Sequence, residues 1–242
     1  MNVPMKRARV HVLNGFEVTV DGSSLKLPSA AQRLVGFLAM RDGPLPRRFV
    51  AASLWPDSSE SRAQGNLRSA LTRLRAVSPM LLESSGSTLR LADAVWVDAR
   101  EVAALAHDLL QGGQISEQLP TTLLALDLLP GWYDEWVVVE QERMRQLRLH
   151  ALEELCSRLT SEGRYGEAID AGLCCVSGDP LRESAHKKLI LAHEAEGNRS
   201  EAIRQYERYR DVLTRELGIE PSPDLKRLVD VPGRNGSDGS MD

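Results

Sequence analysis

Residues 163–169 read Gly-Arg-Tyr-Gly-Glu-Ala-Ile, and residues 197–203 read Gly-Asn-Arg-Ser-Glu-Ala-Ile. The two stretches begin 34 residues apart, and Gly, Glu, Ala and Ile recur in register. A period of about 34 residues is typical of tetratricopeptide helix pairs, in which a Gly ends the first helix and a small Ala lies where two helices cross. Pro180 stands at the closing position of the first copy, whereas Thr214 replaces it in the second. The C-terminal half is therefore predicted to stack helix pairs, an arrangement that usually binds partners.

The chain around this repeat is predicted to be almost entirely helical from Thr121 onward. The expected helices cover about residues 121–128, 133–160, 164–176, 182–196, 199–217 and 223–229. Upstream, a helix is expected from Val97-Asp98 to about Leu110, with a loop at Gly112-Gly113.

The first hundred residues follow a different pattern, in which short alternating stretches come before three helices. Strands are expected at residues 10–13, at 16–20 and near 25–27. Helices are expected at 30–40, 47–54 and 61–77, and a β-hairpin at 81–91. A sheet, three helices and a terminal hairpin is the order of a winged helix with an N-terminal sheet, as in the output domains of two-component response regulators.

The predicted fold is mainly α with a small β component. It comprises an N-terminal winged helix-turn-helix at residues 8–98 and a C-terminal tetratricopeptide-like helical domain at residues 99–229. A Gly-, Ser- and Asp-rich tail at residues 230–242 is expected to be disordered.

The third predicted helix separates its apolar and basic residues onto two faces. Its apolar stripe consists of Ala63, Leu67, Ala70, Leu71 and Leu74. The opposite face carries Arg62, Arg68, Ser69, Thr72 and Arg73. No carboxylate occurs between Arg62 and Val77, although an ordinary solvated helix mixes charges of both signs. This face suits the DNA major groove, where Arg donates to guanine and Ser or Thr meets phosphates or base edges.

Residues next to this helix extend the predicted DNA contact. Arg47 and Arg48 open the second helix, where they are placed for phosphate contacts that position the protein without specifying sequence. Arg90 lies on the hairpin that would form the wing. A basic surface helix with no role in DNA binding is the alternative interpretation.

Composition supports a DNA-binding front half and excludes several other classes. Residues 1–98 contain 13 Lys and Arg against 8 Asp and Glu, whereas the remainder contains 17 against 26. No apolar run is long enough for a membrane span, no secretory signal is recognised, and a cytoplasmic, nucleoid-associated protein is expected. Cys156, Cys174 and Cys175 are expected to be reduced core residues. No catalytic motif, metal site or cofactor site is predicted, so an enzyme is not expected.

The chain resembles the SARP-type transcriptional activators (antibiotic regulatory proteins) of actinobacteria over about residues 8–229. In the first half the resemblance rests on LWPD (54–57) and NLRSALTRLR (66–75). In the second half it rests on LLPGWYDEWVVVEQERMRQLRLHALEEL (128–155), DPLRESAHKKLI (179–190) and ELGIEPSPDL (216–225).

The resemblance implies a pathway-specific activator of secondary-metabolite (antibiotic) biosynthesis genes. Such an activator binds direct repeats in double-stranded DNA upstream of promoters, side by side as a homodimer. It recruits RNA polymerase through the sigma factor and the alpha C-terminal domain. The loop from Trp55 to Glu60 is the expected polymerase contact, with Trp55, Asp57 and Glu60 as candidate residues.

Other interpretations stay open at the level of sequence. The winged helix of a tetratricopeptide-type adaptor or ligand sensor would contact protein instead of DNA, and a DNA binder of this kind could also repress. Trp132, Tyr133 and Trp136 are expected to be core residues. His186 and His193 are expected to be surface or groove residues rather than metal ligands.

Overall fold

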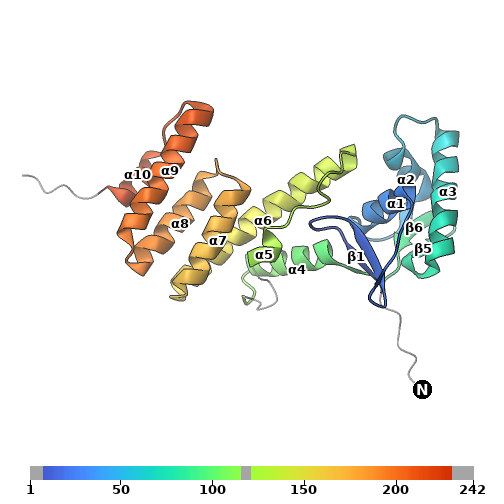
Figure 1. The fold of residues 1–242 in the computed structure, drawn as a ribbon, viewed down its shortest axis with the longest axis horizontal. Helices are drawn as coiled ribbons and strands as arrows, with labels where there is room; N and C mark the ends of the chain where they lie inside the picture. The colour runs from blue at the N-terminus through green and yellow to red at the C-terminus, as the bar shows by residue number, and fades with distance from the viewer. Residues whose placement is uncertain (1–7, 116–120, 231–242) are drawn as a thin grey trace, which may run out of the picture. The chain divides into compact units, whose positions relative to one another are not determined.

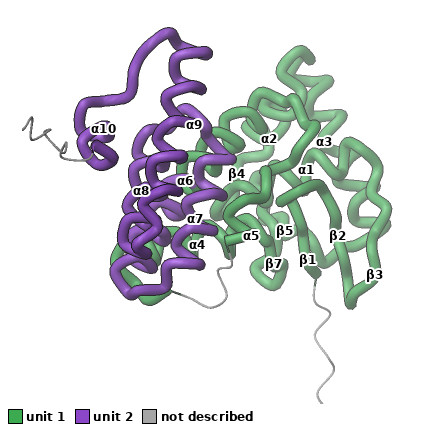
Figure 2. The backbone as a smooth tube through the Cα atoms, turned by 60° about the vertical axis from the view of Figure 1, so that its left-hand side comes forward, with its two compact units in different colours: residues 1–148 green, residues 149–242 purple. Residues whose placement is uncertain are grey.

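The computed structural model describes residues 8–115 and 121–230, and it divides the chain into two compact units. Unit 1 covers residues 1–148 and unit 2 covers residues 149–242 (Figure 2). The tail expected to be disordered lies outside the described residues, apart from Asp230. Each unit is described by itself.

Unit 1 contains two small sheets. The four-stranded sheet has the order β3-β2-β1-β7, and the three-stranded sheet has the order β4-β6-β5. Their strands are β1 (Ala8–His11), β2 (Glu17–Val20), β3 (Ser23–Ser24), β4 (Leu45–Pro46), β5 (Leu82–Ser85), β6 (Thr88–Leu91) and β7 (Trp96–Val97). Asp21 and Gly22, with φ angles of 51° and 80°, form the two-residue turn between β2 and β3. Two successive positive φ angles are what such a tight hairpin requires, and Asp-Gly meets that need at low cost.

Three helices complete the winged helix-turn-helix, namely α1 (Ser29–Ala39), α2 (Arg47–Leu54) and α3 (Glu60–Val77) (Figure 1). The apolar stripe predicted for α3 is buried, with every member at most 4% exposed. It packs against α1 and α2. The helix starts at Glu60, one residue earlier than predicted, and an acidic residue in the first turn is favoured by the helix dipole.

Three sequence predictions for unit 1 were wrong or incomplete. The third strand lies at Ser23–Ser24 instead of near residues 25–27. Strands β4 and β7 were missed because each has two residues, and each exists only by pairing with a strand far away in sequence. Helix α5 covers Thr121–Leu124 instead of 121–128.

The early end of α5 has a tertiary cause. The backbone N–H of Leu129 donates to the carbonyl of Val12 at 2.7 Å, and the N–H of Asn14 donates to the carbonyl of Asp127 at 2.7 Å. Leu13 and Leu128 form an isolated antiparallel bridge. Because this segment pairs with the chain after β1, its backbone groups are not available to continue the helix.

Helix α4 (Asp98–Leu110) and the first half of α6 (Glu135–Ser161) also belong to unit 1. The ring of Trp132 packs over Gly36, where an added Cβ would approach it to 3.3 Å. Trp136 meets Phe37 edge to face, with ring centroids 5.2 Å apart. These two tryptophans therefore pack as predicted. The prediction for Tyr133 was wrong, because Tyr133 is 87% exposed.

The contact boundary between the units follows Arg148, inside α6. The first helices after residue 98 therefore pack with the winged helix. Two ion pairs tie the α1 region to the start of α6. Arg33 of α1 binds Asp134, and Arg41, two residues after α1, binds Glu140 at 2.5 Å. The division of the sequence into modules at residue 98 stays a prediction.

Unit 2 contains the rest of α6 together with α7 (Tyr165–Gly178), α8 (Glu183–Glu196), α9 (Arg199–Leu217) and α10 (Pro223–Val229). The repeat has the structure predicted for it. Gly163 and Gly197 have φ angles of 75° and 86° just after α6 and α8, which is the left-handed geometry that ends a helix. Ala168 and Ala202 are fully buried on α7 and α9.

The interior of unit 2 contains one polar cluster that the sequence did not predict. His186 is 3% exposed, so its placement at the surface or in a groove was wrong. Its ring stacks on Tyr209 with centroids 4.2 Å apart, and its nitrogens lie 3.0 Å from the carbonyl of Pro180 and 2.9 Å from Nε2 of Gln205. Since the amide of Gln205 donates, the facing Nδ1 accepts and His186 is neutral.

Candidate nucleic-acid interface

Helix α3 presents its polar face outward from the winged helix. Arg62, Arg68, Ser69, Thr72 and Arg73 are all exposed, as predicted. Because the opposite stripe is buried against α1 and α2, packing fixes the orientation of this helix. The structure thus gathers five of the eight predicted DNA-contacting residues on one face.

The arginines of α3 have no counter-ion among the described residues. Across the described residues, none of Arg62, Arg68, Arg73 and Arg75 makes an ion pair or a side-chain hydrogen bond. Each guanidinium carries five N–H donors that match phosphate oxygens or the O6 and N7 atoms of guanine. The face therefore has donors and positive charge available for an external anion.

Arg75 was not among the predicted contacts, although it is exposed in the last turn of α3. By helical spacing, Arg75 lies beside the apolar stripe and not opposite it. A long arginine side chain can extend from such a position to the polar side.

The two hydroxyl residues on this face are oriented by the helix itself. Ser69 Oγ donates to the carbonyl of Gly65 at 3.1 Å, and Thr72 Oγ1 donates to the carbonyl of Arg68 at 3.0 Å. Their hydrogens are therefore used within the helix, and their lone pairs face outward. In this state they can accept hydrogen bonds from base amino groups, such as those of cytosine and adenine.

Arg47 and Arg48 have different surroundings. The backbone N–H of Arg47 donates to the carbonyl of Ser87 at 2.8 Å, and its Nη2 donates to Ser84 Oγ at 2.6 Å. Arg47 is thus half-buried and holds the hairpin to α2. The side chain of Arg48 is 84% exposed, and its Nε lies 3.5 Å from Glu60 Oε1. Only Arg48 of the two points freely toward solvent.

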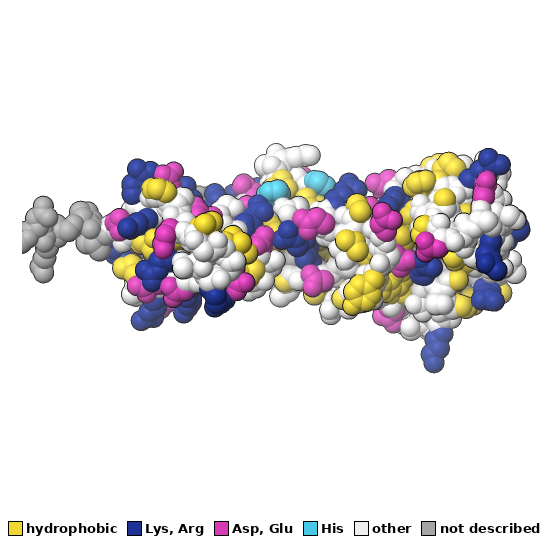
Figure 3. Space-filling view, turned by 90° about the horizontal axis from the view of Figure 1, so that it is seen from above, with side chains coloured by type: hydrophobic (Ala, Val, Ile, Leu, Met, Phe, Trp, Pro, Cys, Tyr) yellow, Lys and Arg dark blue, Asp and Glu magenta, His cyan; other side chains and the backbone are white. Residues whose placement is uncertain are grey.

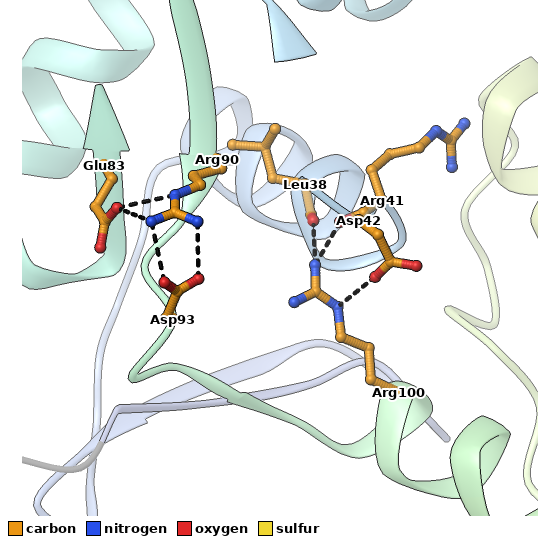
Figure 4. A network of polar contacts seen from close by, with 7 residues as sticks. All are labelled: Leu38, Arg41, Asp42, Glu83, Arg90, Asp93 and Arg100. Atoms are coloured by element: carbon orange, nitrogen blue, oxygen red, sulfur yellow. Dashed lines mark hydrogen bonds and ion pairs between the residues drawn. The ribbon is translucent and has the colours of Figure 1, made fainter. Parts of the chain in front are cut away.

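Arg90 is neutralised by two carboxylates within the hairpin region. Its Nε and Nη2 donate to Glu83 Oε2 at 2.9 and 2.6 Å, and Nη1 and Nη2 lie 3.0 Å from the oxygens of Asp93 (Figure 4). The register of the hairpin pairs Glu83 with Arg90, so a predicted register would have revealed this contact. Contact between Arg90 and DNA would require these ion pairs to be exchanged.

The candidate polymerase-contact residues lie in the loop after α2 and at the first residue of α3. Trp55 follows α2 and is half-buried, whereas Asp57 and Glu60 are exposed. Glu60 accepts a hydrogen bond from Gln64 at 3.0 Å. Within the described part of the chain, Asp57 makes no ion pair or side-chain hydrogen bond. The loop therefore presents one carboxylate that no cation in the described ranges compensates.

Over residues 8–115 and 121–230, no group of three or more His, Cys, Asp or Glu side chains is placed to hold a metal ion. Every helix in the same ranges is too short or too polar to traverse a lipid bilayer. Cys156 and Cys175 are buried free cysteines, and burial raises the pKa of these thiols to about 11 and about 12.

The sequence pattern of the bacterial transcriptional activator domain matches residues 85–230, which is more than half of the chain. The chain belongs to the bacterial transcriptional activator domain family. The resemblance to SARP-type activators is thereby confirmed.

Individual relatives agree with this assignment. Regulatory protein AfsR of Streptomyces coelicolor is 29% identical over 236 residues, a match that covers 91% of this chain and 24% of AfsR. The chain therefore spans about a quarter of the length of that relative. Transcriptional regulatory protein MoaR1 of Mycobacterium tuberculosis is 23% identical over 248 residues, covering 90% of this chain and 76% of MoaR1.

A solved structure shares the fold. Mycobacterium tuberculosis EmbR, solved in complex with a low affinity phosphopeptide, matches with a TM-score of 0.69 and 21% identity. The match covers 93% of this chain and 64% of EmbR. The prediction of a mainly α protein, with a winged helix followed by tetratricopeptide-like helices, is confirmed.

Proposed function

We propose that this protein is a sequence-specific DNA-binding activator and that α3 is its recognition helix. The observation that carries the proposal is the outward face of α3, which holds four arginines without an internal partner and no carboxylate from Arg62 to Val77. A helix of this width and charge fits the major groove, where arginine distinguishes guanine by bidentate hydrogen bonds.

The residues of this face have separate roles. Arg68 and Arg73, in the middle of the exposed face, contact base edges, and Ser69 and Thr72 accept hydrogen bonds from bases beside them. Arg62 and Arg75, near the two ends of the helix, contact phosphates.

Residues outside α3 complete the docking. Arg48 contacts a phosphate without reading sequence. Arg47 acts as a positioning residue, because it holds the hairpin to α2 through Ser84 and Ser87. Arg90 contributes to DNA binding only if a phosphate displaces Glu83 or Asp93.

The activator role follows from the family and from the loop between α2 and α3. The protein binds direct repeats upstream of promoters as a side-by-side homodimer, at the nucleoid in the cytoplasm, and it controls secondary-metabolite biosynthesis genes. It recruits RNA polymerase through the sigma factor and the alpha C-terminal domain, with Trp55, Asp57 and Glu60 as contacts. The role is regulatory and not catalytic. The membership of the family and the uncompensated carboxylate of Asp57 support this part of the proposal.

Selection of duplexes from a random pool tests the proposal. Wild-type protein is expected to enrich a tandem repeated motif, and Arg68→Ala is expected to lose or relax one position of that motif. Arg208→Ala is the matched control, since Arg208 is an exposed arginine of unit 2 that makes no ion pair with the described residues. No enrichment at moderate salt would contradict the proposal and favour the adaptor interpretation.

A further inference from the structure

Unit 1 contains a cavity of about 170 Å³ that the proposed DNA contact does not use. Its walls come from the C-terminal end of α1, one face of α4 and the first half of α6. The floor is apolar and is formed by Ala39, Ala99, Ala103, Met144 and Leu147.

The cavity exists because its walls carry small side chains. Ala39 and Ala99 are fully buried, and Ala103 lies one helical turn after Ala99 on α4. A leucine at any of these positions would extend into the space between the helices. Protein interiors are otherwise packed with few voids larger than a water molecule, so three alanines around one cavity leave room for a ligand.

The rim carries charged groups, and most of them already have partners. Arg100 donates to the carbonyls of Leu38 and Arg41 at 2.9 and 2.5 Å (Figure 4), and to the carbonyl of Ala39 at 2.8 Å. It therefore satisfies the last carbonyls around the C-terminus of α1 and lies 3.9 Å from Asp42. Glu140 is buried and accepts from Arg41 at 2.5 Å.

One cation of the rim is only weakly paired. Arg143 is 76% exposed and approaches Glu140 only to 3.8 Å, and Glu140 is already paired with Arg41. His107, also at the rim, is exposed. Because Arg143 shares Glu140 with Arg41 and is largely exposed, its guanidinium keeps donors that a ligand can reach. A carboxylate is its natural partner, since the two groups form paired hydrogen bonds.

The volume limits the size of the ligand. A cavity of about 150 Å³ in another protein holds one benzene molecule, so this one accommodates one ring or a short branched chain. We propose that the cavity binds a small organic monocarboxylate, with its apolar body against the alanines and Met144 and its carboxylate at Arg143. This site goes beyond DNA binding and does not depend on it.

Methionine methyl groups offer a direct test, because Met40 and Met144 line the cavity. The full chain, labelled with ¹³C at the methionine methyls, is titrated with benzoate and with neutral benzamide. Benzoate is expected to shift the Met144 signal saturably at millimolar concentration or below. Benzamide is expected to bind about tenfold more weakly, because it lacks the charge that Arg143 recognises. Met144→Leu assigns the signal.

Two variants test whether the cavity is a ligand-binding site or only a gap in the packing. Ala103→Leu fills the cavity and should abolish the shift. Arg143→Gln, at an exposed position that does not threaten folding, should reduce benzoate affinity about tenfold and leave benzamide unchanged. Arg208→Gln, on unit 2, should change neither. The proposal is overturned if benzoate causes no saturable shift, if benzamide binds equally well, or if Arg143→Gln binds benzoate like the wild type.

Discussion

The arginines of α3 and those of unit 2 differ in what they face. In unit 2 most arginines lie beside a carboxylate of the same unit. These are Arg164 with Glu162 and Glu167, Arg182 with Glu153, Arg199 with Glu194, Arg204 with Glu201, Arg210 with Asp211, Arg215 with Glu216 and Arg227 with Asp224. Basic and acidic side chains accordingly intermingle over the left-hand part of Figure 3, beside the grey C-terminal tail. The four arginines of α3 have no such neighbours.

The difference shows what each set contributes. Exposed ion pairs add little to stability, so their main effect in unit 2 is to cancel the field of each arginine. On α3 the field is not cancelled, and four like charges on one helix repel each other until an anion binds. A polyanion such as DNA removes that repulsion.

The largest effect is expected for Arg182→Ala in unit 2. Arg182 is mostly buried, and it forms a bidentate pair with Glu153 at 2.7 and 3.1 Å. Its removal leaves a mostly buried carboxylate without its partner, which should lower the free energy of unfolding by about 3 kcal/mol. Chemical denaturation monitored by circular dichroism measures the change. A loss below about 0.5 kcal/mol would show that this arginine is no more structural than those of α3.

The next effect concerns Arg68→Ala and Arg73→Ala, which should behave in the opposite way. Each is expected to weaken binding to the selected DNA site by about 1–3 kcal/mol and to leave the free energy of unfolding within about 0.5 kcal/mol of wild type. Fluorescence anisotropy with the cognate duplex gives the affinities. If both variants bind the cognate duplex as tightly as the wild type does, Arg68 and Arg73 do not contact the bases.

Arg48→Ala should have a smaller and less selective effect. Its side chain is almost fully exposed at the start of α2, where it can meet one phosphate. Affinity for cognate and random duplexes should therefore fall by the same factor. The slope of log affinity against log salt should also become shallower by about one. A loss confined to the cognate site would instead make Arg48 a base-reading residue.

The smallest effect is expected from pH, through His186. Burial lowers the pKa of His186, although the Pro180 carbonyl, Asp179 and Glu183 act against this. Because the unfolded chain binds this proton more readily, the free energy of unfolding should decrease as pH falls below about 6.5. His186→Gln should flatten that part of the profile, and His150→Gln, at an exposed position, should not. If the free energy of unfolding of the wild type does not change between pH about 7 and about 5, His186 is not the neutral, buried group described above.

Local sequence signals predicted the parts of the fold that depend on local structure. The recurring Gly163 and Gly197 marked two helix ends, and the apolar spacing on α3 identified its buried stripe. Contacts between remote segments were not predictable in this way. The pairing of β7 with β1, and the hydrogen bond between Leu129 and Val12 that shortens the α5 region, leave no periodic pattern.

The candidate DNA-binding site was likewise predictable where local spacing decides exposure, and not where contacts between elements decide it. Exposure of Arg62, Arg68 and Arg73 followed from helical spacing alone. The ion pair between Arg90 and Glu83 can be predicted only when the register of the hairpin is known. The hydrogen bond from Arg47 to Ser84 can be predicted only when the packing of α2 against the hairpin is known. Helical spacing locates a charge on a face, but neighbours from other elements decide whether that charge is free.

The most direct test of the unpaired α3 arginines is the dependence of DNA affinity on salt concentration. Wild-type protein is compared with a variant in which Arg62, Arg68, Arg73 and Arg75 are replaced by glutamine, and with a control that carries glutamine at Arg204, Arg210, Arg215 and Arg227. Each lost phosphate contact should reduce the slope of log affinity against log salt by about 0.9. We predict a reduction of about two in the α3 variant, because Arg62 and Arg75 are its proposed phosphate contacts, and no change in the control. Equal slopes in all three proteins, or an equal reduction in both variants, would contradict the assignment of α3 as the DNA-binding helix.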